Sequence, residues 1–302
     1  MSFNKIIVLG AGAVGSIYGA LLSKKNDVML IGNKAHVDAV NSKGLSICGD
    51  INETFYLKAD TEICEIPEKT LIILTTKAYD SAKAIKQIKK LLRKDAVILV
   101  LQNGLGNEEV VKRVAGDKTK ILRGITTMAA EFFKSGRVRF WNGETIIEQN
   151  EVAEEIGEIL NNCMLKTRLS NDINMEAWNK LVVNCVVNPL SALFHVRNCE
   201  LVSDSLKTIR HRIVRECVKV GKAEGITFPE DLKEKVDEKI SSYTNFSSMY
   251  QDVMKRKKTE IDFLNGKVVE LGRKHNIPTP ANETLVCLIK FMGEKNGISR
   301  KN

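Results

Sequence analysis

The sequence lacks the features that mark several special classes of protein. Its 302 residues include only five prolines and twenty glycines, which excludes a collagen-like chain or a proline-rich low-complexity chain. No uninterrupted apolar run approaches the roughly 18 residues that a membrane helix needs. The first residues enter a strand-like run directly, without a long apolar signal core or a small-residue cleavage site. We therefore expect a soluble, cytoplasmic protein with no membrane partner.

The spacing of the cysteines and histidines does not indicate a metal site or a set of disulfides. The seven cysteines are scattered and form no C-x-x-C pair, which argues against a zinc ribbon or a thioredoxin-type site. Most of them stand in apolar company, where a reduced cysteine behaves as a small hydrophobe. The histidines show no ligand spacing; they are His36, His195, His211 and His275. No metal is expected.

Aromatic residues are scarce and the positive charge is dispersed. Aromatic side chains make up 6% of the chain, which leaves little material for stacking nucleic-acid bases, so no nucleic-acid partner is expected despite the net charge of +9. The one dense basic run covers residues 255–258. It is interpreted as a solvated helix face, with a localisation or polyanion patch as the alternative.

The first half of the chain alternates strands and helices. Continuous apolar runs at 5–9, 28–31, 71–75 and 96–101 predict buried strands, and amphipathic segments between them predict helices. This pattern is typical of a parallel sheet covered on both faces. Residues 44–57 suggest a hairpin-like excursion, strand-like pieces follow around 121–148, and residues 151–165 predict a helix.

Strand patterns nearly vanish after about residue 172. Long helical stretches are expected there, at 173–195, 200–224, 231–240, 246–275 and 281–293. The predicted fold is an α/β doubly wound sheet of the Rossmann type, followed by an all-α domain. The predicted boundaries are 1–171 for the nucleotide-binding domain and 172–302 for the helical domain.

A glycine-rich loop joins the first predicted strand to the first predicted helix. It has the pattern G-x-G-x-x-G, made by Gly10, Ala11, Gly12, Ala13, Val14 and Gly15. In this context the first glycine allows a tight turn, the second lets the backbone approach a pyrophosphate, and the third allows close packing of helix and strand. The N–H groups at the helix N-terminus favour phosphates. The loop therefore predicts a dinucleotide cofactor; a glycine-rich turn without a ligand is the alternative.

Residues after the other strands bear on the cofactor and the site. An acid after the second strand favours NAD and a base favours NADP, but this chain has Asn33 and Lys34 there. Lys34 either meets a 2′-phosphate or is a surface lysine, and NADPH is placed slightly ahead of NADH. After the third and fourth strands come Lys77 and Asn103; the latter, followed by glycine, is otherwise an ordinary turn residue. Asn107 is expected to cap the next helix.

A polar stripe interrupts an apolar helix in the second half. Lys180, Asn184 and Asn188 recur at intervals of four, which places them on one face of the helix. Polar side chains in so apolar a helix need partners, because burying an unpaired polar group costs free energy. The stripe lines a functional cleft, or it is a seam satisfied by neighbouring backbone.

A weaker pattern lies further along the chain. Ser248 and Glu260 are twelve residues apart, just over three turns of a continuous helix, so both are expected to reach a shared cleft.

Taken together, these segments resemble the ketopantoate reductases (2-dehydropantoate 2-reductases) over nearly the whole chain. The matching segments are GAGAVG, TTKAYD, LQNGLGNEE, WNKLVVNCVVNPLSAL and NFSSMYQDVMKRKKTEIDFLNG. The resemblance implies an N-terminal Rossmann domain and a C-terminal helical domain, with the active site between them.

The resemblance also implies roles for individual residues. Lys180 matches the catalytic lysine and Glu260 its acidic partner, while Lys77 matches a lysine beside the cofactor. The positions that match substrate-holding residues are Asn103, Asn184, Asn198 and Ser248, and Asn188 matches a further asparagine of the helix stripe. One departure concerns Asn33, where the family usually has an arginine that contacts the NADPH 2′-phosphate.

The activity implied by the resemblance is NAD(P)H-dependent reduction of 2-dehydropantoate to pantoate, a step toward coenzyme A. The implied partner is a small 2-keto acid, and a homodimer is also suggested. Hydride addition to a ketone leaves negative charge on oxygen, which the Lys180 ammonium would stabilise and then protonate. Two alternatives are reduction of another 2-keto acid and a regulator that binds nucleotide without turnover.

Overall fold

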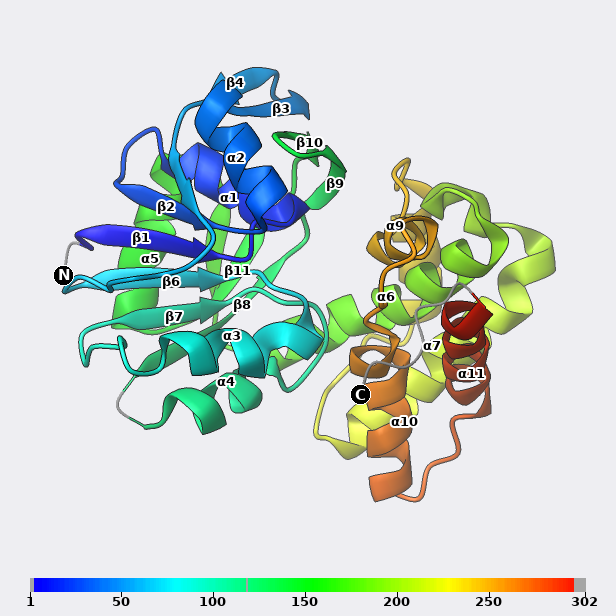
Figure 1. Cartoon of the computed structure of the whole chain (residues 1–302). Coiled ribbons are helices and arrows are strands. Elements are labelled where there is room, and N and C mark those ends of the chain that lie inside the picture. Colours follow the sequence, from blue (N-terminus) through cyan, green and yellow to red (C-terminus); the bar gives the residue numbers. More distant parts are fainter. Residues whose placement is uncertain (1–2, 118, 296–302) are drawn as a thin grey trace. The chain divides into compact units, whose positions relative to one another are not determined.

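The structure, a computed structural model, describes residues 3–117 and 119–295 (Figure 1). It divides into two compact units. The first runs to Gln102 and resumes over Gly106–Ile173, and the second comprises Asn103–Leu105 and the chain from Asn174 onward. Each unit is described by itself.

The first unit is built on an eight-stranded sheet. Its strand order is β12-β11-β8-β7-β6-β1-β2-β5. The strands are β1 (Lys5–Leu9), β2 (Val28–Ile31), β5 (Lys58–Asp60), β6 (Thr70–Leu74), β7 (Val97–Val100), β8 (Lys120–Thr126), β11 (Thr145–Glu148) and β12 (Thr167–Ser170). Neighbouring strands are parallel except β8 and β11, which are antiparallel. From β5 to β8 the order is that of the doubly wound dinucleotide-binding fold.

Helices cover both faces of this sheet because its strands are apolar on both sides. In β1, Ile6 and Val8 pack in the core on one face, with residues of α1 (Ala13–Leu22) and α5 (Glu151–Asn162). Ile7 and Leu9 pack on the other face, with residues of α3 (Ser81–Ile88) and α4 (Asn107–Ala115). Figure 1 shows α3 and α4 side by side on that second face. A run in which every residue is buried is what a strand between two helical layers requires.

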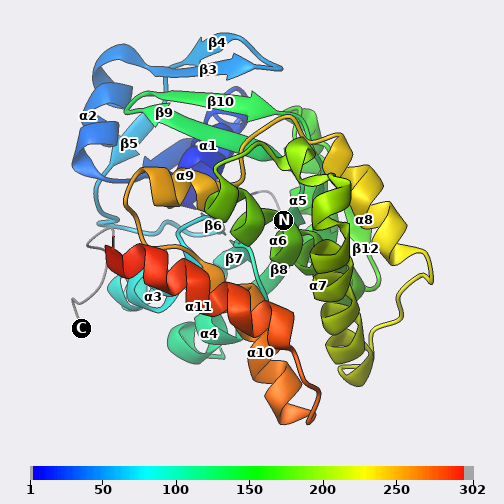
Figure 2. The ribbon, with the colours of Figure 1, turned by 90° about the vertical axis from the view of Figure 1, so that its right-hand side faces the viewer.

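A second, four-stranded sheet packs beside α1 (Figure 2). Its order is β4-β3-β10-β9, with β3 (Leu45–Gly49), β4 (Glu53–Phe55), β9 (Ala129–Lys134) and β10 (Arg137–Trp141). Strands β3 and β4 are antiparallel, which confirms the hairpin expected around 44–57. Strand β10 runs parallel to β3, so this sheet joins segments far apart in the sequence.

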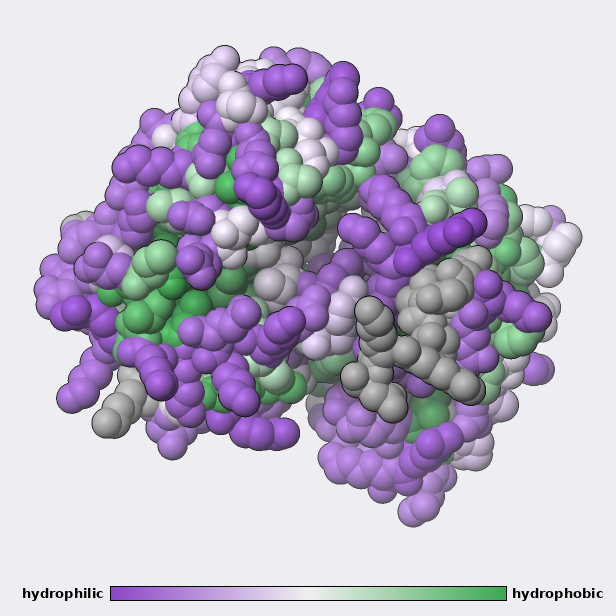
Figure 3. Space-filling view, in the orientation of Figure 1, coloured by the Kyte–Doolittle hydropathy of each residue, from purple (hydrophilic) through white to green (hydrophobic). Residues whose placement is uncertain are grey.

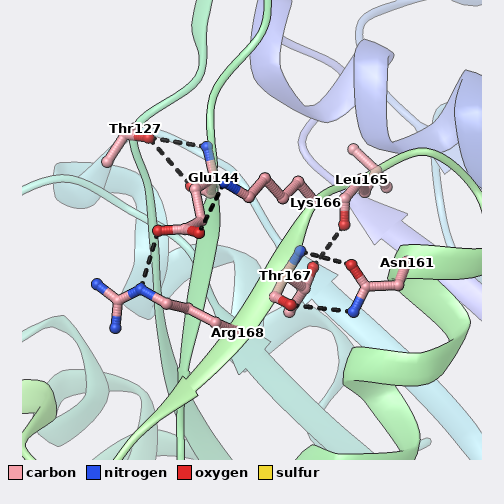
Figure 4. Close-up of polar contacts among 7 residues, drawn as sticks. All are labelled: Thr127, Glu144, Asn161, Leu165, Lys166, Thr167 and Arg168. Carbon is pink, nitrogen blue, oxygen red and sulfur yellow. Dashed lines mark hydrogen bonds and ion pairs between the residues drawn. The ribbon is translucent and has the colours of Figure 1, made fainter.

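Polar contacts fasten the edge of the large sheet (Figure 4). The side chain of Asn161, at the end of α5, pairs with both backbone groups of Thr167 in the edge strand β12, at 2.8 and 3.0 Å. Beside it, the Glu144 carboxylate receives Arg168 Nε at 2.9 Å and lies 3.5 Å from Lys166 Nζ. These contacts tie the edge strand to the end of α5 and to the residue that precedes β11.

The second unit is helical. Its elements are α6 (Ile173–Phe194), the short 3₁₀ turn η2 (Asn198–Leu201), α7 (Asp204–Ala223), α8 (Leu232–Ser241), α9 (Ser248–Met254), the 3₁₀ turn η3 (Ile261–Phe263), α10 (Asn265–Lys274) and α11 (Pro280–Lys295). The apolar side chains of α6 form the middle of its core, together with residues of the other helices. The predicted fold class, a Rossmann-type α/β sheet followed by an all-α region, is confirmed.

The expectation of one helix over 246–275 is wrong. Helix α9 ends at Met254, and Arg256 has a left-handed φ of 51°. The Lys257 N–H bonds to Asp252 O at 2.8 Å and the Arg256 N–H to Val253 O at 3.0 Å, which is the Schellman pattern of a helix C-terminus. The basic run 255–258 is therefore an exposed helix-ending turn and not a helix face, and Ser248 and Glu260 do not share a continuous helix.

A proline inside α6 is matched by a side chain from another helix. Pro189 has no N–H, so it cannot donate to the carbonyl of Cys185 one turn earlier. Asn265 Nδ2 donates to that carbonyl instead, at 2.9 Å, and also to Asn282 Oδ1 at 2.9 Å. Asn282 in turn donates to Glu216 Oε2 at 2.8 Å. This buried chain of hydrogen bonds ties α6, α7, α10 and α11 together.

Hydrophilic side chains predominate on the face drawn in Figure 3. None of the described helices combines the length and the hydropathy that a membrane span requires. Within residues 3–117 and 119–295, no group of three or more His, Cys, Asp or Glu side chains is placed to hold a metal ion.

Candidate functional site

The glycine loop between β1 and α1 is closely packed against the end of β6. Gly10 has a φ of +119°, and a Cβ there would lie 2.4 Å from the backbone nitrogen of Thr76. A Cβ on Gly15 would lie 2.2 Å from the carbonyl oxygen of Gly10. The Thr75 hydroxyl donates to that same carbonyl at 2.8 Å. Only glycine fits at positions 10 and 15.

The remaining glycine of the loop faces open space. A Cβ on Gly12 would meet no atom within 4 Å. Gly12 is the N-cap residue of α1 and has no side chain to bond the first N–H groups of the helix, whose first turn carries no acid. The first N–H groups of a helix have no partner within the helix, and they attract anions. The loop therefore fits a pyrophosphate, with Gly12 leaving room for its approach.

The two polar residues that follow β2, Asn33 and Lys34, both make contacts within the next helix. Asn33 is the N-cap of α2 (Lys34–Lys43), and its side-chain oxygen accepts the His36 N–H at 3.0 Å. Lys34 is exposed, and its ammonium lies 3.3 Å from a carboxylate oxygen of Asp38, one turn further along the helix. The side chain of Asn33 is thus a helix cap.

A buried histidine joins this region to the small sheet. His36 is fully buried, and its Nδ1 accepts the Gly136 N–H at 3.0 Å. Its Nε2 therefore carries the proton and donates to Ser16 Oγ at 3.1 Å. Burial lowers the pKa of His36, so the ring is neutral in the folded protein.

Two further predicted residues follow β6 and β7. Lys77 is half-buried and precedes the 3₁₀ turn η1 (Ala78–Asp80). Asn103 is half-buried and belongs to the helical unit, where a Cβ on Gly104 would lie 2.4 Å from Phe263 O. Asn107 does not cap α4: Gly106, with a φ of +81°, occupies the N-cap position and Asn107 is the first helical residue.

The predicted polar stripe lies along α6. Lys180 and Asn184 are half-buried, and Asn188 is buried. They occupy successive turns of one helix, most of whose apolar residues pack in the core of the helical unit. The spacing of four therefore brings these three side chains to one side of the helix, as the sequence indicates.

The electrostatics of Lys180 distinguish it from an ordinary lysine. Burial lowers the pKa of Lys180 to about 8, while the negative charge of Glu260 opposes the shift and the positive charge of Lys239 adds to it. Glu260 is buried and lies at the start of η3. A lysine with a pKa near 8 is mostly protonated at neutral pH and still able to give up its proton, which suits a general acid.

Asn198 and Ser248 lie on two segments that are bonded to each other. Asn198 begins η2, and its backbone N–H donates to Asn245 O at 3.1 Å. Ser248 begins α9, whose N-cap Ser247 accepts the Tyr250 N–H at 3.0 Å. Asn198 is 3% exposed, and its Oδ1 accepts no hydrogen bond from the described residues. A buried acceptor of this kind fits a ligand hydroxyl.

Sequence reasoning missed the residues that support these side chains. Ser191, on α6, hydrogen-bonds the hydroxyl of Ser247 at 2.7 Å and so fixes the start of α9. Asn265 satisfies the carbonyl that Pro189 leaves without a donor. A proline within an apolar helix indicates that one carbonyl needs a hydrogen-bond donor from outside the helix, but no pattern in the sequence predicts which residue provides it.

Comparison with protein families covers most of the chain. Residues 6–151 match the family described as ketopantoate reductase PanE/ApbA, and residues 172–293 match ketopantoate reductase PanE/ApbA C terminal. A 2-dehydropantoate 2-reductase of Pyrococcus horikoshii is 37% identical over 98% of this chain and 100% of its own length. One of Archaeoglobus fulgidus is 32% identical over 99% of this chain and 100% of its length.

Solved structures agree with the sequence matches. A PanE/ApbA family ketopantoate reductase from Ralstonia eutropha has a TM-score of 0.90 and 28% identity, covering 97% of this chain and 99% of that one. A D-mandelate dehydrogenase with NADH and anilino(oxo)acetate has a TM-score of 0.90 and 27% identity, with the same coverage. The glycine loop, the fold and these matches together show that the chain is an enzyme of the ketopantoate reductase family.

Proposed function

We propose that this enzyme reduces 2-dehydropantoate to pantoate with a reduced nicotinamide cofactor, as a cytoplasmic step of pantothenate and coenzyme A biosynthesis. The observation that carries the proposal is Lys180 on the polar stripe of α6, with its lowered pKa and the charge of Glu260 acting on it. The relatives named 2-dehydropantoate 2-reductase support the choice of substrate.

The residues of this chain would handle charge and protons during the reaction. A bound reduced nicotinamide supplies the hydride. The Lys180 ammonium stabilises the negative charge that develops on the carbonyl oxygen and donates a proton to it. Glu260 favours the charged form of this lysine. Asn103, Asn184, Asn188, Asn198 and Ser248 are proposed to hold the carboxylate and hydroxyl groups of the substrate.

The cofactor site is proposed to use the glycine loop and Lys77. Gly10, Gly12 and Gly15 shape the loop for a pyrophosphate. NADPH is placed ahead of NADH because no acid follows β2. Asn33 already caps α2, so a 2′-phosphate would need another cation, for which Lys34 is the candidate.

The first test is turnover and its dependence on pH. Purified enzyme should oxidise NADPH when 2-dehydropantoate is added, and parallel runs with NADH give the cofactor preference. The Lys180→Ala variant should lose about 10²–10⁴-fold in turnover while it still binds NADPH. Because the protonated lysine is the active form, kcat/KM should fall above a pH of about 8.

A matched pair of variants tests the assignment of that pH limit. Glu260→Gln removes the charge that raises the pKa of Lys180 and should move the alkaline fall to lower pH. Lys239→Met removes a charge that lowers the same pKa and should move it to higher pH. Full turnover by Lys180→Ala would show that Lys180 is not the general acid. An alkaline fall at the same pH in both variants would show the same.

A second substrate class is favoured by one comparison. The D-mandelate dehydrogenase of similar fold is named for an aromatic 2-hydroxy acid. If the enzyme leaves 2-dehydropantoate unchanged, the same assay across branched and aromatic 2-keto acids would identify the substrate. A homodimer is a further part of the proposal, and light scattering of the purified protein measures it.

A further inference from the structure

The turn η2 is held in place by an arginine that the proposed chemistry does not use. Arg210, on α7, is 2% exposed. Its Nη1 donates to Leu201 O at 2.6 Å and to Ser203 O at 2.7 Å. Both carbonyls lie in the loop 197–203, which contains η2 and begins next to Asn198. One guanidinium nitrogen therefore fixes the far end of this loop.

The other nitrogens of the same guanidinium are fixed by α8. Arg210 Nε lies 2.8 Å from Asp237 Oδ1, and Nη2 lies 2.9 Å from Asp237 Oδ2, a two-point pairing that sets the plane of the guanidinium. His211 Nε2 lies 2.9 Å from Asp237 Oδ2. We name Arg210 and Asp237 the guanidinium clamp.

The near end of the loop is bonded to the segment 243–245. The N–H groups of Asn198 and Cys199 donate to Asn245 O and Tyr243 O, at 3.1 and 2.9 Å. Arg197 Nη1 donates to Thr244 O at 2.7 Å. Three successive carbonyls of this segment are thus held by the loop, and the segment leads directly into the start of α9. The clamp therefore acts on the backbone that carries both Asn198 and Ser248.

An ion pair between a buried arginine and a partly buried aspartate is an unusual way to stabilise such a contact. Removing two charges from water costs free energy that their attraction often only offsets, and apolar side chains of similar volume serve stability as well. What the guanidinium adds is direction, because its donors are held in one plane and reach two carbonyls of one loop. Direction matters where a side chain meets a substrate, since a small misplacement reduces activity strongly.

We propose that Arg210 and Asp237 are positioning residues, which set the place of Asn198 and Ser248 and thereby the affinity for the keto acid. This inference rests on the proposed function. Arg210 acts through the loop 197–203 and touches no reacting group. Asn198 Oδ1, buried and without a donor among the described residues, is the atom whose place the clamp sets.

The test compares Arg210→Lys with a control on the same helix. Lysine keeps the charge but loses the planar donors, so KM for 2-dehydropantoate should rise at least about tenfold, with the Kd for NADPH unchanged. Glu216 is also buried on α7, and it holds the N–H groups of Ala281 and Asn282 at 2.9 and 3.0 Å, away from the loop. Glu216→Gln should leave KM within about twofold of the wild-type value.

Combination with Asn198→Ala separates positioning from general stability. If the clamp acts through Asn198, Arg210→Lys should raise KM much less in the Asn198→Ala background than in the wild type. An unchanged KM in folded Arg210→Lys, or an equal rise in both backgrounds, overturns the proposal. Asp237→Asn, which keeps the volume of the side chain, replaces Arg210→Lys if that variant does not fold.

A measurement that does not depend on turnover distinguishes failure of the clamp proposal from failure of the proposed function. Amide hydrogen exchange at Asn198 and Cys199 reports the bonds between the loop and the segment 243–245. Asp237→Asn should speed exchange at both amides relative to the wild type, whether or not the enzyme accepts 2-dehydropantoate. Unchanged exchange overturns the clamp alone, whereas a wild-type enzyme inactive on this substrate overturns only the proposed function.

Discussion

Replacing Asn265 should destabilise the helical unit, and the cost should depend on Pro189. Asn265 Nδ2 donates to the carbonyl that the proline leaves without a helical donor, and to Asn282 Oδ1. Asn265→Leu keeps the branched shape of the side chain and removes both hydrogen bonds. Asn265, Asn282 and Cys185 are all 0% exposed, so water cannot replace the lost donor.

The magnitude follows from the count of orphaned acceptors. Each buried acceptor left without a donor costs about 1–3 kcal/mol. The substitution leaves the Cys185 carbonyl without a donor and leaves Asn282 Oδ1 with only the weak Cys217 thiol donor, at 3.8 Å. It also removes Asn265 Oδ1, which accepts no hydrogen bond from the described residues. The net loss in the free energy of unfolding should be about 1–3 kcal/mol. In a Pro189→Ala background, the new N–H at position 189 can serve Cys185 O, so the same substitution should cost close to nothing.

Tryptophan fluorescence can follow this unit selectively. The chain has two tryptophans, Trp141 in β10 of the first unit and Trp178 in α6 of the second. In a Trp141→Phe background, urea unfolding monitored by Trp178 reports the helical unit. Four proteins complete the cycle: the background itself, Pro189→Ala, Asn265→Leu and the double variant. An equal cost of Asn265→Leu with and without the proline would refute the reasoning, because Asn265 would then not act on the orphaned carbonyl.

Two further predictions concern the first unit. Gly15→Ala should lower the melting temperature and weaken NADPH binding, because its Cβ would lie 2.2 Å from Gly10 O. Gly12→Ala, whose Cβ would meet no atom within 4 Å, should weaken NADPH binding without lowering the melting temperature. Thermal shift measurements with and without NADPH test both expectations. Because burial lowers the pKa of His36, the unfolded chain binds its proton more readily, and stability should fall as the pH drops below about 6.5. His36→Gln should flatten that part of the stability profile in urea titrations, and an identical slope in the variant would contradict the role of the ring.

The parts of the fold that follow from local patterns could be predicted from the sequence. The buried strands β1, β2, β6 and β7 are continuous apolar runs, and the glycine loop lies where a strand meets a helix. The stripe of Lys180, Asn184 and Asn188 needs only the period of an α-helix to place it on one face. In each case the information lies within a few residues of the feature itself.

The parts that depend on contacts between distant residues could not be predicted. Helix α9 ends at a left-handed arginine, Arg256, where a glycine is the usual sign of such an end, so nothing in the sequence marked the break. The guanidinium clamp joins Arg210 to Asp237, 27 positions away, and both look like ordinary helix-surface residues in the sequence. Asn265 meets a carbonyl 80 positions away.

The segment Asn103–Leu105 affects how the helical unit folds during synthesis and whether it can be moved to another protein as a separate domain. It is synthesised about 70 residues before the rest of the unit to which it belongs, and Leu105 packs against the helical core. The nascent helices therefore complete their packing on a piece of chain that left the ribosome much earlier. For the same reason the helical unit is not one continuous stretch of sequence that can be moved to another protein. A gene fusion that began at Asn174 would contain its helices without Leu105, which packs on them.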